Sequence, residues 1–190
     1  MRIQSVAILA LISILFLCGC YESEVPLSKN PSSKVDPRLI GSWIRIPKND
    51  NEKGISLLLI NFNDNEYLIA WKEDGDNETV IARGFNTKIY NTNIINLQNI
   101  VPIDKNDRTY VFSKYEFNAK GNLVVNIISD DFADLKGKKF MSSKEFNDFI
   151  KQNIYKDGLF GDSIEFQPTK EINFGINLKS STGDNQCRAY

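Results

Sequence analysis

The chain of 190 residues contains no histidine, the side chain that most often acts as a general base near neutral pH. This excludes Ser-His-Asp and Cys-His catalysis, as well as zinc sites with histidine ligands. The remaining acid–base groups are carboxylates, and Asp130, Asp131 and Asp134 lie close together in the sequence. Paired carboxylates cleave glycosidic bonds when they are held about 5–10 Å apart with shifted pKa values. Because the basic segment 136–139 (KGKK) follows directly, we expect a solvated loop and assign no catalytic residue.

A second acidic stretch alternates as in a calcium-binding loop, with Asp74, Asp76 and Glu78. An EF-hand loop needs Gly at its sixth position and Glu at its twelfth, where this chain has Thr79 and Phe85. The segment is therefore expected to be a hairpin turn. The sequence indicates no metal and no cofactor.

Composition limits the partners that the protein can have. Hydrophobic residues are 42% and charged residues 25% of the chain, close to the average of globular proteins. Lysine plus arginine number 23 and aspartate plus glutamate 24. This balance argues against a nucleic-acid partner, because phosphate binding needs a basic face.

The first twenty residues have the character of an export signal. Arg2 supplies a positive charge, and residues 6–17 (VAILALISILFL) form an apolar run of 12 residues broken only by Ser13. Such a run matches the apolar region of a secretion signal, about 7–15 residues long. It is too short to cross about 30 Å of hydrocarbon as a helix.

The run ends in Leu17-Cys18-Gly19-Cys20, which resembles the lipobox of bacterial lipoproteins. The resemblance implies that residues 1–19 are a lipoprotein signal peptide, cleaved after Gly19. It also implies diacylglycerol on Cys20 through a thioether, and usually a further acyl chain such as palmitate on the new amino terminus. Two or more acyl chains give lasting membrane attachment, so the expected location is the cell envelope. An ordinary cleaved signal and an uncleaved anchor are the alternatives.

The residue after the expected lipid site bears on sorting. Tyr21 follows Cys20, whereas an aspartate at this position would favour retention in the inner membrane. In a Gram-negative host, the family's sorting rule would therefore favour the outer membrane, facing the periplasm or the surface.

Cysteine usage predicts no intramolecular disulfide. Cys18 leaves with the signal and Cys20 is acylated, so Cys187 is the remaining thiol. Because the chain has no histidine to activate it, we do not interpret Cys187 as a nucleophile.

Composition divides the mature chain into three parts. Residues 20–37 are expected to form a lipidated, flexible tether, because prolines and serines leave no periodic apolar pattern. Residues 38–178 are expected to form one β domain, long enough for a single core. Residues 179–190 (KSSTGDNQCRAY) are polar and expected to fray.

Strand patterns dominate residues 38–178. Short segments rich in Ile, Val, Tyr and Phe alternate with clusters of Asn, Asp and Gly, including Asn118–Asn122, which is typical of a type I turn with a glycine bulge. The pattern predicts a mainly β fold, an antiparallel meander that forms a small barrel or sandwich. The expected strands are Leu39–Ile46, Ile55–Phe62, Tyr67–Lys72, Glu78–Phe85, Lys88–Tyr90, Ile94–Leu97, Thr109–Phe117, Leu123–Ser129 and Ser163–Gln167.

Alternation assigns faces within residues 109–117. Lys114 and Glu116 are expected to face water. The residues expected to face the interior are Val111, Ser113, Tyr115 and Phe117.

One amphipathic helix is expected near residues 143–155. Ser142 and Glu145 form a capping box. The helix is expected to cover a sheet or plug the end of a barrel, with partner binding as the alternative. Its apolar residues recur at helical spacing: Phe146, Phe149, Ile150 and Ile154.

Gly41-Ser42-Trp43, at the start of the first long strand, is similar to the first motif of lipocalin-like β-barrels. The resemblance implies that Gly41 permits a close backbone approach and that Trp43 plugs the closed end of a barrel. The rest of the chain departs from that family, because it has no Thr-Asp-Tyr element and no identifiable late arginine.

Two hypotheses about function follow, both non-enzymatic. In the first, the barrel interior binds a small apolar ligand, and the candidate lining residues are Trp71, Tyr110, Phe112 and Tyr115. In the second, the protein is an interaction module with a solid core, such as an envelope accessory subunit, an inhibitor or an immunity protein. A hollow interior would favour the first hypothesis, and a filled core the second.

Overall fold

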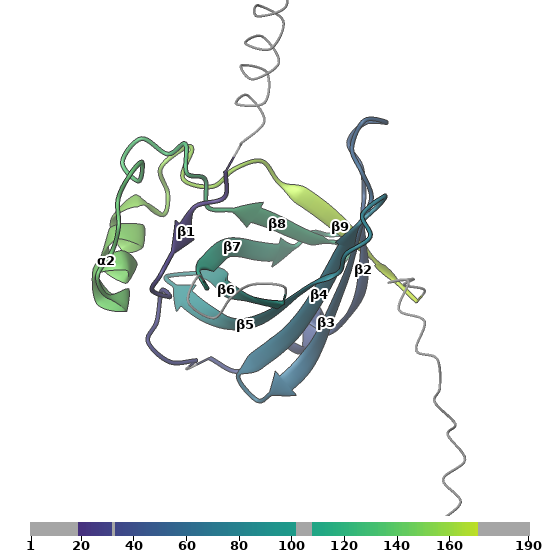
Figure 1. Cartoon of the computed structure of the whole chain (residues 1–190), viewed down its shortest axis with the longest axis horizontal. Helices are drawn as coiled ribbons and strands as arrows, with labels where there is room; N and C mark the ends of the chain where they lie inside the picture. The colour runs from purple at the N-terminus through teal and green to yellow at the C-terminus, as the bar shows by residue number, and fades with distance from the viewer. Residues whose placement is uncertain (1–18, 32, 102–107, 171–190) are drawn as a thin grey trace, which may run out of the picture.

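The computed structural model describes residues 19–31, 33–101 and 108–170, which form a closed antiparallel β-barrel with one α-helix beside it (Figure 1). The mainly β fold expected from the sequence is confirmed, as a barrel rather than a sandwich. In chain order the elements are β1 (Glu22–Ser23), the 3-10 helix η2 (Pro37–Leu39), β2 (Gly41–Arg45), β3 (Ile55–Asn63), β4 (Glu66–Glu73), β5 (Val80–Ile89), β6 (Thr92–Val101), β7 (Tyr110–Phe117), β8 (Leu123–Ile127), α2 (Ser143–Asn153) and β9 (Ile164–Thr169).

Eight strands, β2 to β9, close the barrel as an up-and-down meander. Each strand from β2 to β8 pairs antiparallel with the next one along the chain. Strand β9 completes the ring by pairing with both β8 and β2. Strand β1 pairs with β7 at Val111 and Tyr110, beyond the residues of β7 that pair with β8.

Alternation along the strands builds two separate apolar cores. The first lies inside the barrel, and the inward positions expected in β7 are confirmed, because Tyr115 and Phe117 belong to it. The second lies outside the barrel wall, between α2 and the outer face of β5, β6 and β7. Its buried residues are Tyr21, Leu27, Ile89, Ile94, Phe112, Ile128, Phe132, Leu135, Phe140, Phe146, Ile150, Ile154 and Leu159.

Helix α2 covers the outside of the barrel on the side of β1 (Figure 1). The Ser142 hydroxyl accepts a hydrogen bond from the Glu145 amide at 3.2 Å, which confirms the expected N-cap. Phe146 and Ile150 are fully buried. The Phe146 ring packs edge-on against Phe112 of β7, with ring centres 4.8 Å apart, so the expected core-facing stripe is confirmed.

Strand β5 is one strand where the sequence predicts two, Glu78–Phe85 and Lys88–Tyr90. The polar pair Asn86 and Thr87 interrupts the apolar pattern, and this makes the segment resemble a turn. Both residues are nevertheless buried, and each side chain forms a hydrogen bond with a residue of a neighbouring strand. Asn86 donates to the Tyr67 hydroxyl at 2.7 Å inside the barrel, and the Thr87 hydroxyl accepts from Asn96 at 2.9 Å outside it. Asn86 Oδ1 has no hydrogen-bond partner among the described residues. The Asn86 amide nitrogen and the Thr87 hydroxyl are paired, and paired polar groups can stay buried, so the strand continues through these residues.

Residues 20–31, which we call the N-terminal strap, pack against the barrel instead of forming the flexible tether that their composition predicts. Tyr21 is 7% exposed and Leu27 is 1% exposed. The Leu27 amide donates to Asn96 Oδ1 of β6 at 2.8 Å, and the Leu27 carbonyl accepts from Asn147 of α2 at 3.0 Å. The strap therefore connects the barrel wall to the helix.

The 3-10 helix η2 closes one end of the barrel. Trp43 is 5% exposed, and its indole N–H donates to the Leu39 carbonyl at 3.0 Å. Its ring packs on Phe117, with ring centres 6.0 Å apart. Trp43 therefore fills this end of the barrel. The close approach expected at Gly41 is not observed, because a Cβ there would meet no atom within 4 Å; the residue instead has φ of 141°, which favours glycine.

Several sequence features lie outside the described residues: Cys18 with most of the expected signal peptide, Cys187, and the polar segment 179–190. Among the residues that the structure describes, no helix is long and apolar enough to cross a membrane.

Candidate functional site

The barrel is hollow at the end opposite Trp43. A cavity of about 310 Å³ opens there. Typical ligand sites measure about 300–1,000 Å³, so the volume is at the lower end of that range. Its lining residues come from the strap and from six barrel strands, β3, β4, β6, β7, β8 and β9: Cys20, Ile55, Leu57, Ile69, Trp71, Leu97, Asn99, Val111, Ser113, Val125, Ile127, Ile164 and Phe166.

A narrower space of about 70 Å³ continues from this cavity toward the closed end. Leu39 and Leu123 line its inner part. The two spaces share five lining residues, so we treat them as one channel, which we call the barrel cavity. The shared residues are Leu57, Ile69, Leu97, Ser113 and Val125.

The walls of the barrel cavity are almost entirely apolar. Asn99 and Ser113 are the polar side chains of the wider part, apart from Cys20 at its mouth. Period-two alternation explains this, because every second residue of each strand points inward. At Gly84 the wall is bare, and an added Cβ would lie 2.9 Å from Ile69 Cδ1 and 3.2 Å from Leu97 Cδ2. The absence of a side chain there lets these two residues line the cavity.

Cys20 stands at the mouth of the barrel cavity. It forms an isolated antiparallel bridge with Ser129, just beyond the end of β8. The next residue fixes its position, because the Tyr21 amide donates to the Ile128 carbonyl at 3.0 Å and the Tyr21 hydroxyl donates to the Lys138 carbonyl at 3.1 Å. Neither bond involves residues 1–19. The other bond of the bridge, from the Asp130 amide to the Gly19 carbonyl at 3.3 Å, would be lost with those residues, and the two Tyr21 bonds would remain to hold Cys20 near the mouth.

The four candidate lining residues are divided between two faces of the barrel. Trp71 lines the wide part of the barrel cavity, and Tyr115 lines the narrow part. Phe112 belongs to the outer core, where it meets Phe146, and Tyr110 packs against that same core. Because Tyr115 faces inward, Tyr110 and Phe112, at odd separations from it in β7, face outward.

Sequence reasoning missed most of the cavity wall. The aliphatic residues of β3, β6 and β8 line it. Ser113, which alternation in β7 predicts to face the interior, also lines it but is not among the four candidate lining residues. The inward pattern 111, 113, 115 and 117 of β7 is the signal that identifies this wall. Tyr110 and Phe112 belong to the outer face, so an aromatic side chain by itself does not distinguish the inner face of the barrel from the outer one.

A polar network borders the closed end of the barrel cavity. The Tyr67 hydroxyl accepts from the Asp36 amide at 2.5 Å and from Asn86 at 2.7 Å. Burial raises the pKa of both Tyr67 and Tyr115. Hydrogen bonds from Arg38 hold the pKa of Asp36 below its usual value. Asp36 is therefore charged and both phenols are neutral at pH 7, which suits a structural plug rather than acid–base chemistry.

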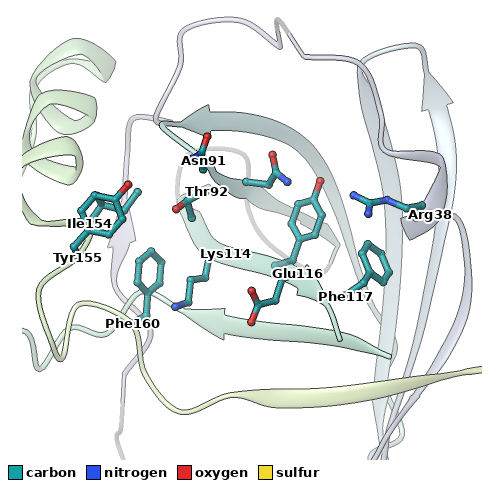
Figure 2. Close-up of a pocket in the computed structure, with 11 residues that line it drawn as sticks. Arg38, Asn91, Thr92, Lys114, Glu116, Phe117, Ile154, Tyr155 and Phe160 are labelled. Atoms are coloured by element: carbon teal, nitrogen blue, oxygen red, sulfur yellow. The ribbon is translucent and has the colours of Figure 1, made fainter. Parts of the chain in front are cut away.

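A separate groove of about 460 Å³ lies on the outer surface, between the turn after β5, the end of β7 and the end of α2. Figure 2 shows Lys114 and Glu116 projecting into it between the rings of Phe160 and Phe117. The Lys114 ammonium lies 4.7 Å from the centre of the Phe160 ring. The lining of this groove is mostly polar, whereas that of the barrel cavity is mostly apolar.

The acidic cluster after β8 shows no catalytic arrangement. Asp134 is exposed and pairs with Lys156 at 2.9 Å. A hydrogen bond from Lys156 lowers the pKa of Asp134, whereas a general acid needs a raised pKa. The described residues also include no group of three or more potential metal ligands.

Comparison with family models, with curated proteins and with solved structures finds no match to this chain.

Proposed function

We propose that this protein is a lipid-anchored envelope lipoprotein of bacteria that binds a small apolar ligand in its barrel. The observation that supports the proposal is the barrel cavity, which is apolar, open at one end and closed by Trp43 at the other. A filled core would have favoured an interaction module. Ligands of matching chemistry are single hydrocarbon chains, such as fatty acids.

The anchor is the lipid implied by the lipobox-like sequence that ends at Cys20. In this chemistry the Cys20 thiolate attacks the glycerol carbon of a membrane phospholipid. A C–S bond forms while the C–O bond to phosphate breaks, and the headgroup phosphate leaves with the bonding electron pair. The thiol proton goes to the surroundings. Because Cys20 lies at the mouth of the barrel cavity, the anchor would hold that mouth at the membrane surface.

Fluorescence with cis-parinaric acid tests ligand binding. The mature chain carrying Cys20→Ser, which cannot be acylated there, is titrated with this probe. Trp71 lines the barrel cavity, so binding should transfer its excitation energy to the probe, and Trp71→Phe should remove most of this signal. Ser113→Phe should abolish binding, because Ser113 lines both parts of the cavity.

Ser56→Phe is the matched control. Ser56 lies opposite Ile44 and Lys72, on the outer face of the barrel, so the same substitution there should leave binding unchanged. No binding by the Cys20→Ser chain, or equal binding by the Ser113→Phe and parent chains, would refute an apolar ligand in the cavity.

A second candidate function, recognition of a protein partner, is favoured by the outer groove. Tyr155 lines the groove (Figure 2) and is 76% exposed. Its ring stacks on that of Tyr90, which is 58% exposed, with ring centres 6.1 Å apart. Exposed aromatic residues are common at binding hot spots. If this candidate is correct, Tyr155→Ala should abolish a specific crosslink to an envelope protein, while Lys29→Ala in the exposed part of the strap should retain it.

A further inference from the structure

We propose that the barrel cavity is occupied by one of the protein's own acyl chains, carried on Cys20. The inference rests on the proposed lipid anchor and names the resident ligand of the proposed site. Such self-occupation differs from binding of a free ligand, because the acyl chain is covalently attached at the mouth of the cavity. The observation behind it is that the residue expected to carry the lipid is itself a lining residue of the apolar cavity.

The position of Cys20 makes the barrel cavity accessible to an acyl chain attached to it. Cys20 lies at the rim with Trp71, Val111 and Ile127 as fellow lining residues of the same space. The rigid link through Tyr21, which is 7% exposed, prevents Cys20 from moving away from the rim. A tethered chain reaches a neighbouring site at an effective concentration in the millimolar range. An untethered lipid has no such advantage.

The volume of the barrel cavity permits one acyl chain and no more. Taking about 30 Å³ for a methylene group, as for a water molecule in the liquid, the 310 Å³ part of the cavity holds roughly ten methylene groups. The inner part of a palmitoyl chain would fill this space, and the carbons nearest the glycerol would span the mouth. A second chain would not fit beside it.

Attachment to the membrane would persist if one of the acyl chains left the bilayer and entered the barrel. The lipobox resemblance implies two chains in the diacylglyceryl group and usually a third on the amino terminus. Lasting attachment needs two membrane signals, so one chain can enter the barrel while the other two remain in the membrane. Occupation also removes the apolar walls of the open cavity from water.

Photocrosslinking in cells tests the inference on the full-length protein. Cells are grown with a palmitate analogue that carries a diazirine and an alkyne, irradiated, and the purified protein is digested for mass spectrometry. We expect acylation of Cys20 and intramolecular crosslinks to peptides containing Trp71, Val111 or Ile127. These crosslinks should exceed those to the outer face of β3 at least tenfold. Ser113→Phe should reduce the crosslinks to the cavity peptides at least fivefold without changing acylation of Cys20. Ser56→Phe should leave both the crosslinks and the acylation unchanged.

Three results would overturn the inference. One is a labelled Cys20 whose crosslinks reach only lipids or other proteins. Another is equal crosslinking of cavity and outer-face peptides. The third is absence of label on Cys20, which would also remove the proposed anchor.

Failure of the inference is distinguishable from failure of ligand binding. If the Cys20→Ser chain binds cis-parinaric acid but the acylated chain shows no cavity crosslinks, free-ligand binding stands and self-occupation is wrong. If cavity crosslinks form but the Cys20→Ser chain never binds the probe, self-occupation stands and free-ligand binding is wrong.

Discussion

The attachment of the N-terminal strap can be tested at Leu27. This side chain is 1% exposed and belongs to the outer core, next to α2. Its backbone is also bound on both sides, by Asn96 of the barrel and Asn147 of the helix. Leu27→Ala keeps both backbone bonds and removes only the buried side chain, so it measures how much packing the strap contributes.

The expected cost follows from burial. A fully buried Leu→Ala change lowers the free energy of unfolding by about 2–5 kcal/mol, because transfer and cavity terms add. We take about 3 kcal/mol, since the strap lies at the surface of the core and can partly collapse. In a domain of this size each kcal/mol lowers Tm by about 2–4 °C. The variant should therefore melt about 6–12 °C below the parent.

Asn96→Ala removes the other half of the same attachment. The Asn96 side chain accepts from the Leu27 amide and donates to the Phe85 carbonyl and the Thr87 hydroxyl, all within 3.1 Å. Each buried group left without a partner costs about 1–3 kcal/mol. Because Leu27 and Asn96 are in contact, the double variant should lose less than the sum of the two single losses.

Urea denaturation followed by circular dichroism measures these free energies, and thermal melts give Tm. Lys29→Ala is the matched control, because Lys29 is an exposed residue of the same strap and should change stability by less than about 0.5 kcal/mol. A flexible tether predicts that Leu27→Ala behaves like Lys29→Ala and shows no coupling to Asn96. Either result would refute the packing described for the strap.

Three further predictions concern charge, ionisation and the helix cap. A hydrogen bond from Arg83 lowers the pKa of Glu66. The stabilisation by the Glu66 carboxylate is therefore present above about pH 4.5 and is lost as pH falls through the lower pKa of the folded state. Glu66→Gln should cost about 1.5–3 kcal/mol at pH 7 and flatten the acid arm of the curve of stability against pH. Burial raises the pKa of Tyr21 to about 12, so the unfolded chain ionises first, stability should fall between about pH 10 and 12, and Tyr21→Phe should reduce that fall. Ser142→Ala removes the acceptor of the Glu145 amide and should cost about 1 kcal/mol in urea melts, whereas an unchanged midpoint would exclude a working cap.

Much of the barrel could be predicted because local patterns and tertiary structure agree there. In β7, Lys114 and Glu116 alternate with the inward Tyr115 and Phe117, so the period of two identifies the strand and its faces at once. The turn at Asn118–Asn122 is equally local, since Gly121 adopts φ of 80° and its amide bonds the Asn118 carbonyl. Such features need no information from distant residues.

Other features depend on partners that lie far away in the sequence. Asn86 and Thr87 resemble a turn until Tyr67 and Asn96 supply their hydrogen bonds. The candidate lining residues show the same dependence. Tyr110 and Phe112 are as aromatic as Tyr115, but α2 covers the outer face of β7 and gives them an apolar environment outside the barrel.

Periodicity, turn residues and the leader are local properties, so the residues alone predict a mainly β meander, one capped helix and a cysteine in a lipobox-like context. Closure of β9 against β2, the packing of the strap and the open cavity beside Cys20 become visible only in the folded chain. This is because each of these joins segments separated by many residues. Whether apolar side chains meet across a barrel or leave a space between them depends on the diameter and stagger of the closed sheet, which no single strand specifies.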